Sequence, residues 1–134
     1  MENENVKVSY ALVGEGEPSF KKVLWFSRQD MTNDQSQALV KKFGGWFEMI
    51  KVDGTIPNAF VLKDYIDECD VIALVAPIHI QEQVLKIAGD KPVIMALSRR
   101  QLVSDENSGE SKAISTFEKW ERLVKIIVEK EDFS

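Results

Sequence analysis

Residues Val71 to Ala76, which read VIALVA, decide the fold. This run contains no polar residue, lies between Asp70 and Pro77, and is too short for a buried helix of ordinary length. It therefore predicts a strand that is covered on both faces, as strands of a parallel sheet are.

Further strands alternate with helices on both sides of this run. Apolar residues at three- and four-residue spacing predict helices over Ala59 to Glu68 and Ile80 to Ala88. Thr32 to Gln35 has the form of a capping box, which predicts the start of another helix, and this helix is expected to stop at Gly44. The other predicted strands are Val6 to Val13, Phe20 to Phe26, Trp46 to Val52 and Val93 to Leu97.

This alternation predicts one α/β domain over residues 1–134, a Rossmann-like three-layer domain with a mainly parallel sheet, because strands separated by helices need crossover connections. After the polar loop Ser104 to Lys112, the segments Ala113 to Phe117 and Leu123 to Val128 look extended, and they predict a C-terminal antiparallel hairpin. The segment from Phe117 to Lys130 fits a helical stripe almost as well. Its β-branched residues favour a strand.

Composition limits the classes of function. The chain has 17 Lys and Arg against 22 Asp and Glu, a formal charge of −5, which argues against a protein that coats duplex DNA or a membrane surface. No apolar run approaches the length of a membrane helix, and the N-terminus lacks the features of a signal peptide, so we expect a cytoplasmic protein. A single cysteine, Cys69, and a single histidine, His79, exclude an internal disulfide and a multi-histidine zinc site.

Ligands of parallel sheets usually bind at the carboxyl ends of the strands, where loop amides and helix N-termini converge. Three of the four arginines, Arg28, Arg99 and Arg100, follow predicted strand ends, and guanidinium groups match phosphate geometry. The alternative is that these arginines pair with Asp30, Asp53 and Asp105 around loop ends, or lie in solvent. The predicted ligand-binding residues are Ser27, Arg28, Thr32, His79, Ser98, Arg99 and Arg100.

His79 precedes a predicted helix and can exchange a proton near neutral pH, so His79 and Ser27 are the candidate catalytic residues. Whether the protein is an enzyme stays open. The strand before Ser27 leads into neither a glycine-rich dinucleotide fingerprint nor a P-loop, which disfavours NAD, FAD and NTP hydrolysis, and we expect no cofactor and no metal site. Cys69 lies between a helix and a buried strand, which is typical of a packed small residue.

Three segments together resemble the small CARF-like domains, the CRISPR-associated Rossmann-fold family: VLWFSRQDMTNDQ at 23–35, VIALVAPIH at 71–79 and VIMALSRR at 93–100. The resemblance covers about Phe20 to Arg100, and the same outline also fits uncharacterised proteins of phages or mobile elements. Members of the family are typically dimers that hold cyclic oligoadenylate messengers across their two-fold axis, and some cleave them without metal. The resemblance implies that Ser27, Arg28 and Thr32 lie near phosphate or base, with Ser98 and Arg99 opposite. An effector domain is missing here, and the segment after residue 105 has no counterpart.

The sequence therefore predicts a small homodimer that binds a phosphorylated, nucleotide-like molecule at the strand ends, with a cyclic oligonucleotide as one such ligand. If it is an enzyme, the predicted reaction is metal-independent phosphodiester cleavage, as in a ring nuclease. The alternative is a protein-interaction or structural module without a small-molecule ligand, in which Trp120 and the terminal strands contact a partner. Trp25 is expected in the core, and Trp120 at an interface.

Overall fold

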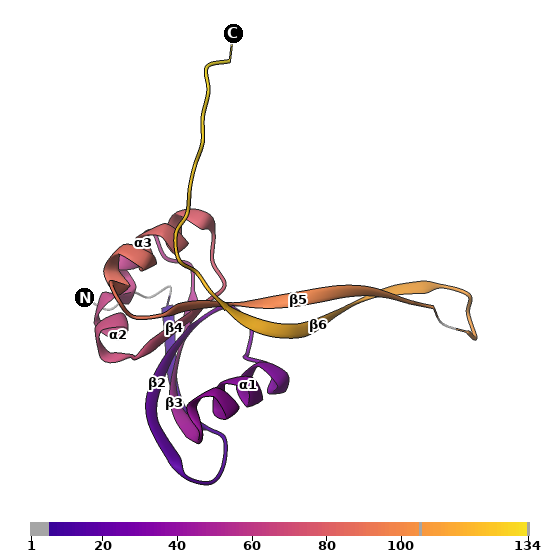
Figure 1. Cartoon of the computed structure of the whole chain (residues 1–134), viewed down its shortest axis with the longest axis horizontal. Helices are drawn as coiled ribbons and strands as arrows, with labels where there is room; N and C mark the ends of the chain where they lie inside the picture. Colours follow the sequence, from indigo (N-terminus) through magenta and orange to yellow (C-terminus); the bar gives the residue numbers. More distant parts are fainter. Residues whose placement is uncertain (1–5, 105, 134) are drawn as a thin grey trace.

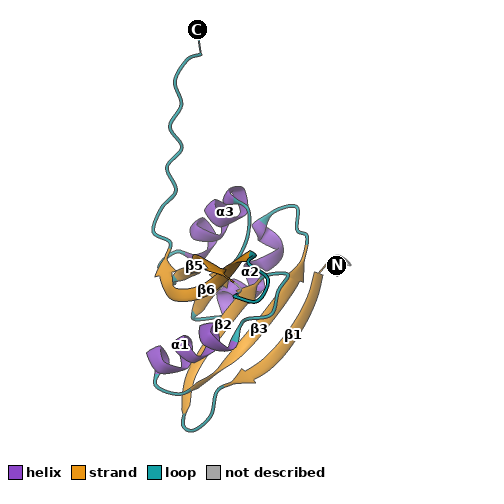
Figure 2. Ribbon diagram, turned by 90° about the vertical axis from the view of Figure 1, so that its right-hand side faces the viewer, coloured by secondary structure: helices purple, strands orange, loops and turns teal. Residues whose placement is uncertain are grey.

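The protein is a mixed α/β fold built on one six-stranded sheet, in a computed structural model that describes residues 6–104 and 106–133 (Figures 1 and 2). The strand order is β1-β3-β2-β4-β5-β6. The strands are β1 (Val6–Val13), β2 (Pro18–Phe26), β3 (Trp46–Gly54), β4 (Val71–Leu74), β5 (Val93–Ser104) and β6 (Ser111–Arg122). The helices are α1 (Asn33–Phe43), the 3₁₀ helix η1 (Ala59–Leu62), α2 (Lys63–Glu68) and α3 (Ile78–Ala88).

Two apolar clusters lie on opposite faces of the sheet, because alternate residues of each strand point to opposite sides. On one face, Leu24 and Ile72 pack with side chains of η1, α2 and α3, including the fully buried Ile66. On the other face, Trp25 and Leu39 pack together, so that α1 covers this side. Figure 1 shows α1 on one side of the sheet and α2 and α3 on the other. The core therefore lies over the central strands β2 and β4.

The prediction of a Rossmann-like three-layer domain with a mainly parallel sheet is wrong. Strands β3, β2, β4 and β5 run parallel, but the parallel pairing of β4 with β5 is confined to Ile72–Ala73 and Val93–Ile94. The β1–β3 pairing is antiparallel along all of β1, and β5 pairs antiparallel with β6 over nearly the whole of both 12-residue strands. Most residue pairing is therefore antiparallel, and strand (43%) exceeds helix (25%).

The C-terminal hairpin also differs from the one predicted. Its first strand is β5, which continues to Ser104 instead of ending at Leu97, and its second strand is β6. Leu123 to Val128 forms neither a strand nor a helix, so both interpretations of this segment are wrong. The half of the hairpin beyond Leu97 projects from the body, and we call it the arm (Figure 1). Residues 123–133 leave the body in another direction, and we call them the tail.

The local helix signals read from the sequence are confirmed. The Thr32 hydroxyl accepts the backbone N–H of Gln35, and the Gln35 side chain accepts the N–H of Thr32. Gly44 ends α1 in the left-handed conformation, with φ of 79°, where a side chain would be strained. Within the described residues, no helix has the length and apolar character needed to cross a membrane.

Candidate functional site

A cleft of about 500 Å³ opens where β2, β3 and β4 end. The chain leaves β2 toward α1 on one face of the sheet and leaves β4 toward α3 on the other, so the two strand ends diverge and leave a crevice between them. The apolar wall consists of Phe26, Ile56, Val75, Pro77 and Ile80. The polar side chains that line it are Ser27, Arg28, Gln29, Thr55 and His79.

Arg28 supplies positive charge to this cleft. Its Nη2 donates a hydrogen bond to the Thr55 hydroxyl at 2.8 Å, and the side chain is exposed. Among the described residues, no carboxylate forms an ion pair with Arg28; the neighbouring Asp30 pairs with Lys51 instead. A guanidinium with a neutral protein partner retains donors and charge for an anion.

Ser27 lies at the floor of the cleft, directly after β2. It is 5% exposed, and its N–H donates to the carbonyl of Val52 at 3.2 Å, which holds it against β3. Its hydroxyl accepts the N–H of Gln29 at 3.1 Å. Ser27 therefore shapes the loop that carries Arg28.

His79 lies in the first turn of α3, lines the same cleft and is exposed. Pro77 occupies the N-cap position, and no side chain caps this helix, so the positive end of the helix dipole faces the cleft without an internal partner. No hydrogen bond joins His79 to Ser27 in the described part of the chain. The two candidate catalytic residues share a cleft but do not form a nucleophile and base pair.

Thr32 does not line the cleft. Its hydroxyl accepts from Gln35 N at 3.2 Å, and its N–H donates to the Gln35 side chain at 2.9 Å. These two hydrogen bonds use the side chain to start α1. Thr32 therefore has a structural role as the cap of α1, and its contact with a ligand stays a prediction.

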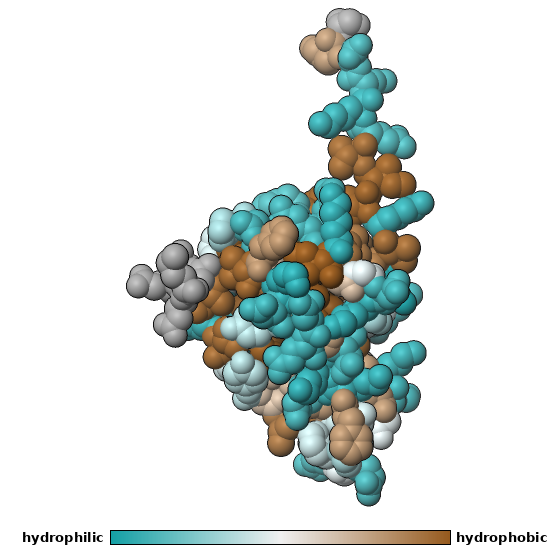
Figure 3. Space-filling model, turned by 90° about the vertical axis from the view of Figure 1, so that its left-hand side faces the viewer, coloured by the Kyte–Doolittle hydropathy of each residue, from teal (hydrophilic) through white to brown (hydrophobic). Residues whose placement is uncertain are grey.

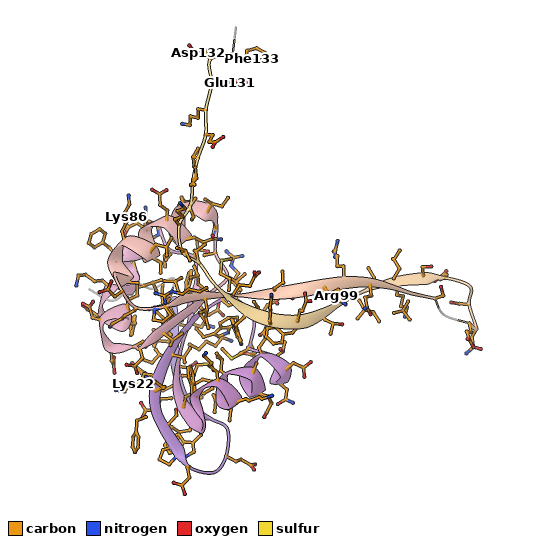
Figure 4. All side chains as sticks on the ribbon, viewed as in Figure 1. Lys22, Lys86, Arg99, Glu131, Asp132 and Phe133 are labelled. Carbon is orange, nitrogen blue, oxygen red and sulfur yellow. The ribbon has the colours of Figure 1, made fainter. Side chains whose placement is uncertain are left out.

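Ser98, Arg99 and Arg100 lie on the arm, away from the cleft, and the expected common rim of arginines does not form (Figure 4). The expectation was wrong because β5 does not end at Leu97. Consecutive strand residues point to opposite faces, so Arg99 and Arg100 cannot act together. Arg99 forms an ion pair with Glu118, with 2.9 Å between Nη2 and Oε1. The partner is thus Glu118 of β6, which is not one of the three carboxylates named in the alternative.

Thr55 is the residue that sequence reasoning missed. It follows β3 as Arg28 follows β2, so the strand-end rule that selected Arg28 could have selected it. Cys69 is buried, and burial, followed by the charge of Glu68, raises the pKa of its thiol to about 11. A protonated, buried thiol agrees with the interpretation of Cys69 as a packed residue.

In the described ranges 6–104 and 106–133, no three His, Cys, Asp or Glu side chains gather in a way that could hold a metal ion. A comparison with known protein families finds no match, and no curated protein matches the sequence significantly. The resemblance to CARF-like domains therefore stays a prediction.

Proposed function

We propose that the protein binds a small phosphorylated, nucleotide-like molecule in the cleft at the ends of β2, β3 and β4. The carrying observation is an Arg28 guanidinium that, among the described residues, is bonded to the Thr55 hydroxyl alone, beside an apolar wall in a cleft of about 500 Å³. Clefts of roughly 300–1,000 Å³ suit small organic ligands. The apolar wall suits a base or sugar, and the guanidinium suits a phosphate.

The charge of the chain makes this local arrangement important. With a formal charge of −5, the protein as a whole repels anions, so an anion must be held by local donors. Arg28 and the uncapped N-terminus of α3 both line the cleft and supply positive potential from two parts of the chain. We further propose that the protein is a homodimer and that it is located in the cytoplasm. A cyclic oligonucleotide is one of the ligands that we propose.

Isothermal titration calorimetry with mononucleotides, cyclic oligonucleotides and inorganic phosphate tests the proposal. Arg28→Ala should weaken binding by about 10-fold or more, as loss of a charge-assisted hydrogen bond does. Arg99→Ala is the matched control, because it removes an exposed arginine that lies on the arm, and it should leave the affinity unchanged. Equal affinities for the two variants, or no binding of any compound by the wild type, would contradict the proposal.

Cleavage of the ligand is a separate question. The missing hydrogen bond between Ser27 and His79 favours binding over nucleophilic cleavage. Incubating a cyclic oligonucleotide with the protein in excess chelator, followed by chromatography, distinguishes the two. Linear products that disappear in His79→Ala or Ser27→Ala would show a metal-independent phosphodiesterase.

The arm favours a second candidate function, that of a protein-interaction module. A two-stranded hairpin is marginally stable in water on its own, and the arm exposes Leu102 (78%) and Ile114 (46%). Such a ribbon gains stability when a partner covers one face. The test is an affinity pull-down with the wild type and with Leu102→Lys: a partner that the wild type retains and the variant loses supports this function. Trp120 does not serve it as predicted, because its ring packs against Trp25.

A further inference from the structure

The first part of the tail, residues 123–128, is an extended, mostly apolar segment without a strand partner in the described chain. The N–H of Leu123 donates to the carbonyl of Val93 at 2.7 Å, and no backbone hydrogen bond joins the described residues after it to the rest of the chain. Val124, Ile127 and Val128 are 76%, 66% and 64% exposed. Figure 3 shows that the part of the tail next to the body is hydrophobic. A run of β-branched residues in extended form fits a pleated sheet better than water.

Strand β1 offers the complementary surface at the opposite edge of the sheet. It pairs only with β3, so its outer backbone groups are free in the described chain. Val6 and Val8 pack partly on the core, and Tyr10 and Leu12, which share their face, are each 68% exposed. Edge strands of this length usually carry charges that prevent strand addition, but β1 has only Lys7. β1 therefore has the properties of an edge strand that can pair with a further strand.

The tail of one copy cannot fill this position in its own sheet. The tail starts beside β5, and β1 lies four strand spacings away, which is roughly 19 Å. An extended chain spans about 3.3 Å per residue, so the crossing alone uses about six residues. These are the apolar residues 123–128, and only the polar end of the tail would remain to pair with β1. Figure 2 shows the tail and β1 on opposite sides of the body.

We propose that residues 123–128 of one copy add as a seventh strand to β1 of a second copy, and that the exchange is reciprocal. The partner is a second copy because the described part of this one chain carries both an unpaired extended segment and a free strand edge. A two-fold exchange pairs both segments in each copy and closes the assembly as a dimer. Val124, Ile126 and Val128 lie on one face of an extended segment, and this face would cover Tyr10 and Leu12.

Sedimentation equilibrium of the full chain tests the exchange against the monomer mass of 15.2 kDa. The wild type should have twice this mass at micromolar concentration. The tail variant Val124→Asp/Val128→Asp and the edge variant Leu12→Lys should each raise the dimer dissociation constant by about 100-fold or more, because every dimer contains the changed surface twice. All three substituted side chains are exposed, so circular dichroism should show an unchanged fold.

Leu102→Lys is the matched control, since it places the same charge on an exposed leucine of the arm and should leave the dimer intact. A mixture of the tail variant with the edge variant should contain more dimer than either alone, because one intact tail then meets one intact edge. A monomeric wild type, dissociation by Leu102→Lys but not by the tail variant, or a mixture without dimer would overturn the proposal. None of these outcomes depends on ligand binding in the cleft.

Discussion

Trp120 fastens the hairpin to the body, and its removal should destabilise the protein strongly. The indole N–H donates to the carbonyl of Gln35 at 3.0 Å, which ties β6 to α1. The ring meets Trp25 edge-on, with centroids 6.1 Å apart, and contacts Phe117 with centroids 5.7 Å apart. The side chain is half-buried within the cluster that α1 covers.

The magnitude follows from these contacts. Truncating a fully buried tryptophan costs about 3–5 kcal/mol, and half burial reduces this to about 2 kcal/mol. The lost hydrogen bond between the indole N–H and the half-buried Gln35 carbonyl adds about 1 kcal/mol. We therefore expect Trp120→Ala to lower the free energy of unfolding by about 3 kcal/mol. Trp120→Phe keeps most of the ring contact and should lower it by about 1–2 kcal/mol.

Urea unfolding followed by far-ultraviolet circular dichroism measures both values. The tail variant Val124→Asp/Val128→Asp serves as background, so that dissociation does not enter the transition. Phe20→Ala is the control: this aromatic ring is 85% exposed, and its loss should change the free energy of unfolding by less than about 0.5 kcal/mol. A Trp120→Ala variant as stable as Phe20→Ala would refute the anchoring role and return Trp120 to an interface.

Four further predictions concern local interactions of three residues. Thr32→Ala should cost about 1 kcal/mol in urea unfolding, because α1 loses one half of its capping box, whereas Thr32→Ser should keep it. Cys69 in the folded protein should react slowly with a thiol reagent at pH 8, and fast reaction without denaturant would contradict its burial. Because the thiol pKa rises from 9.0 to about 11 on folding, the folded state holds the proton longer, so stability should fall between pH 9 and pH 11 by at most about 2–3 kcal/mol relative to Cys69→Ala. The Asp67 carboxylate accepts a hydrogen bond from Lys63 Nζ at 2.7 Å. This hydrogen bond lowers the pKa of the Asp67 carboxyl below its ordinary value of 3.8. The stability that it contributes is present above pH 3.8 and lost as pH falls through the lowered pKa, so thermal unfolding temperatures of wild type and Asp67→Asn should converge in acid.

Short-range signals in the sequence predicted the helices and the central strands well. The capping box at Thr32 and the all-apolar run at Val71 involve residues close in the chain, and their physics does not depend on distant partners. The hairpin was different. Residues beyond Leu97 on β5 are exposed on both faces and carry no apolar alternation, so only pairing with β6 across a polar loop makes them a strand.

The predicted site residues also differ in how well local sequence signals placed them. Ser27, Arg28 and His79 line one cleft because they follow parallel strands that lie side by side, and the strand-end rule needs no more than that. Arg99 lies outside the cleft because β5 does not end at Leu97. The strand-end rule assumed an end at the point where β5 continues into the arm. Side-chain alternation then sends Arg100 to the opposite face. The sequence predicted that Arg28, Arg99 and Arg100 share one site, and of these three the structure places Arg28 at the cleft.

The position of the cleft also decides how many ligands a dimer should hold. In the order β1-β3-β2-β4, the cleft spans the ends of three strands of one chain, and the proposed exchange contacts the outer side of β1. Arg28 and Thr55 therefore come from the same copy and need no residue of the other. Calorimetry should give one ligand per chain. One ligand per two chains would instead place it across the two-fold axis, as the resemblance to CARF-like domains implies, and the tail variant would then lose ligand binding together with the dimer.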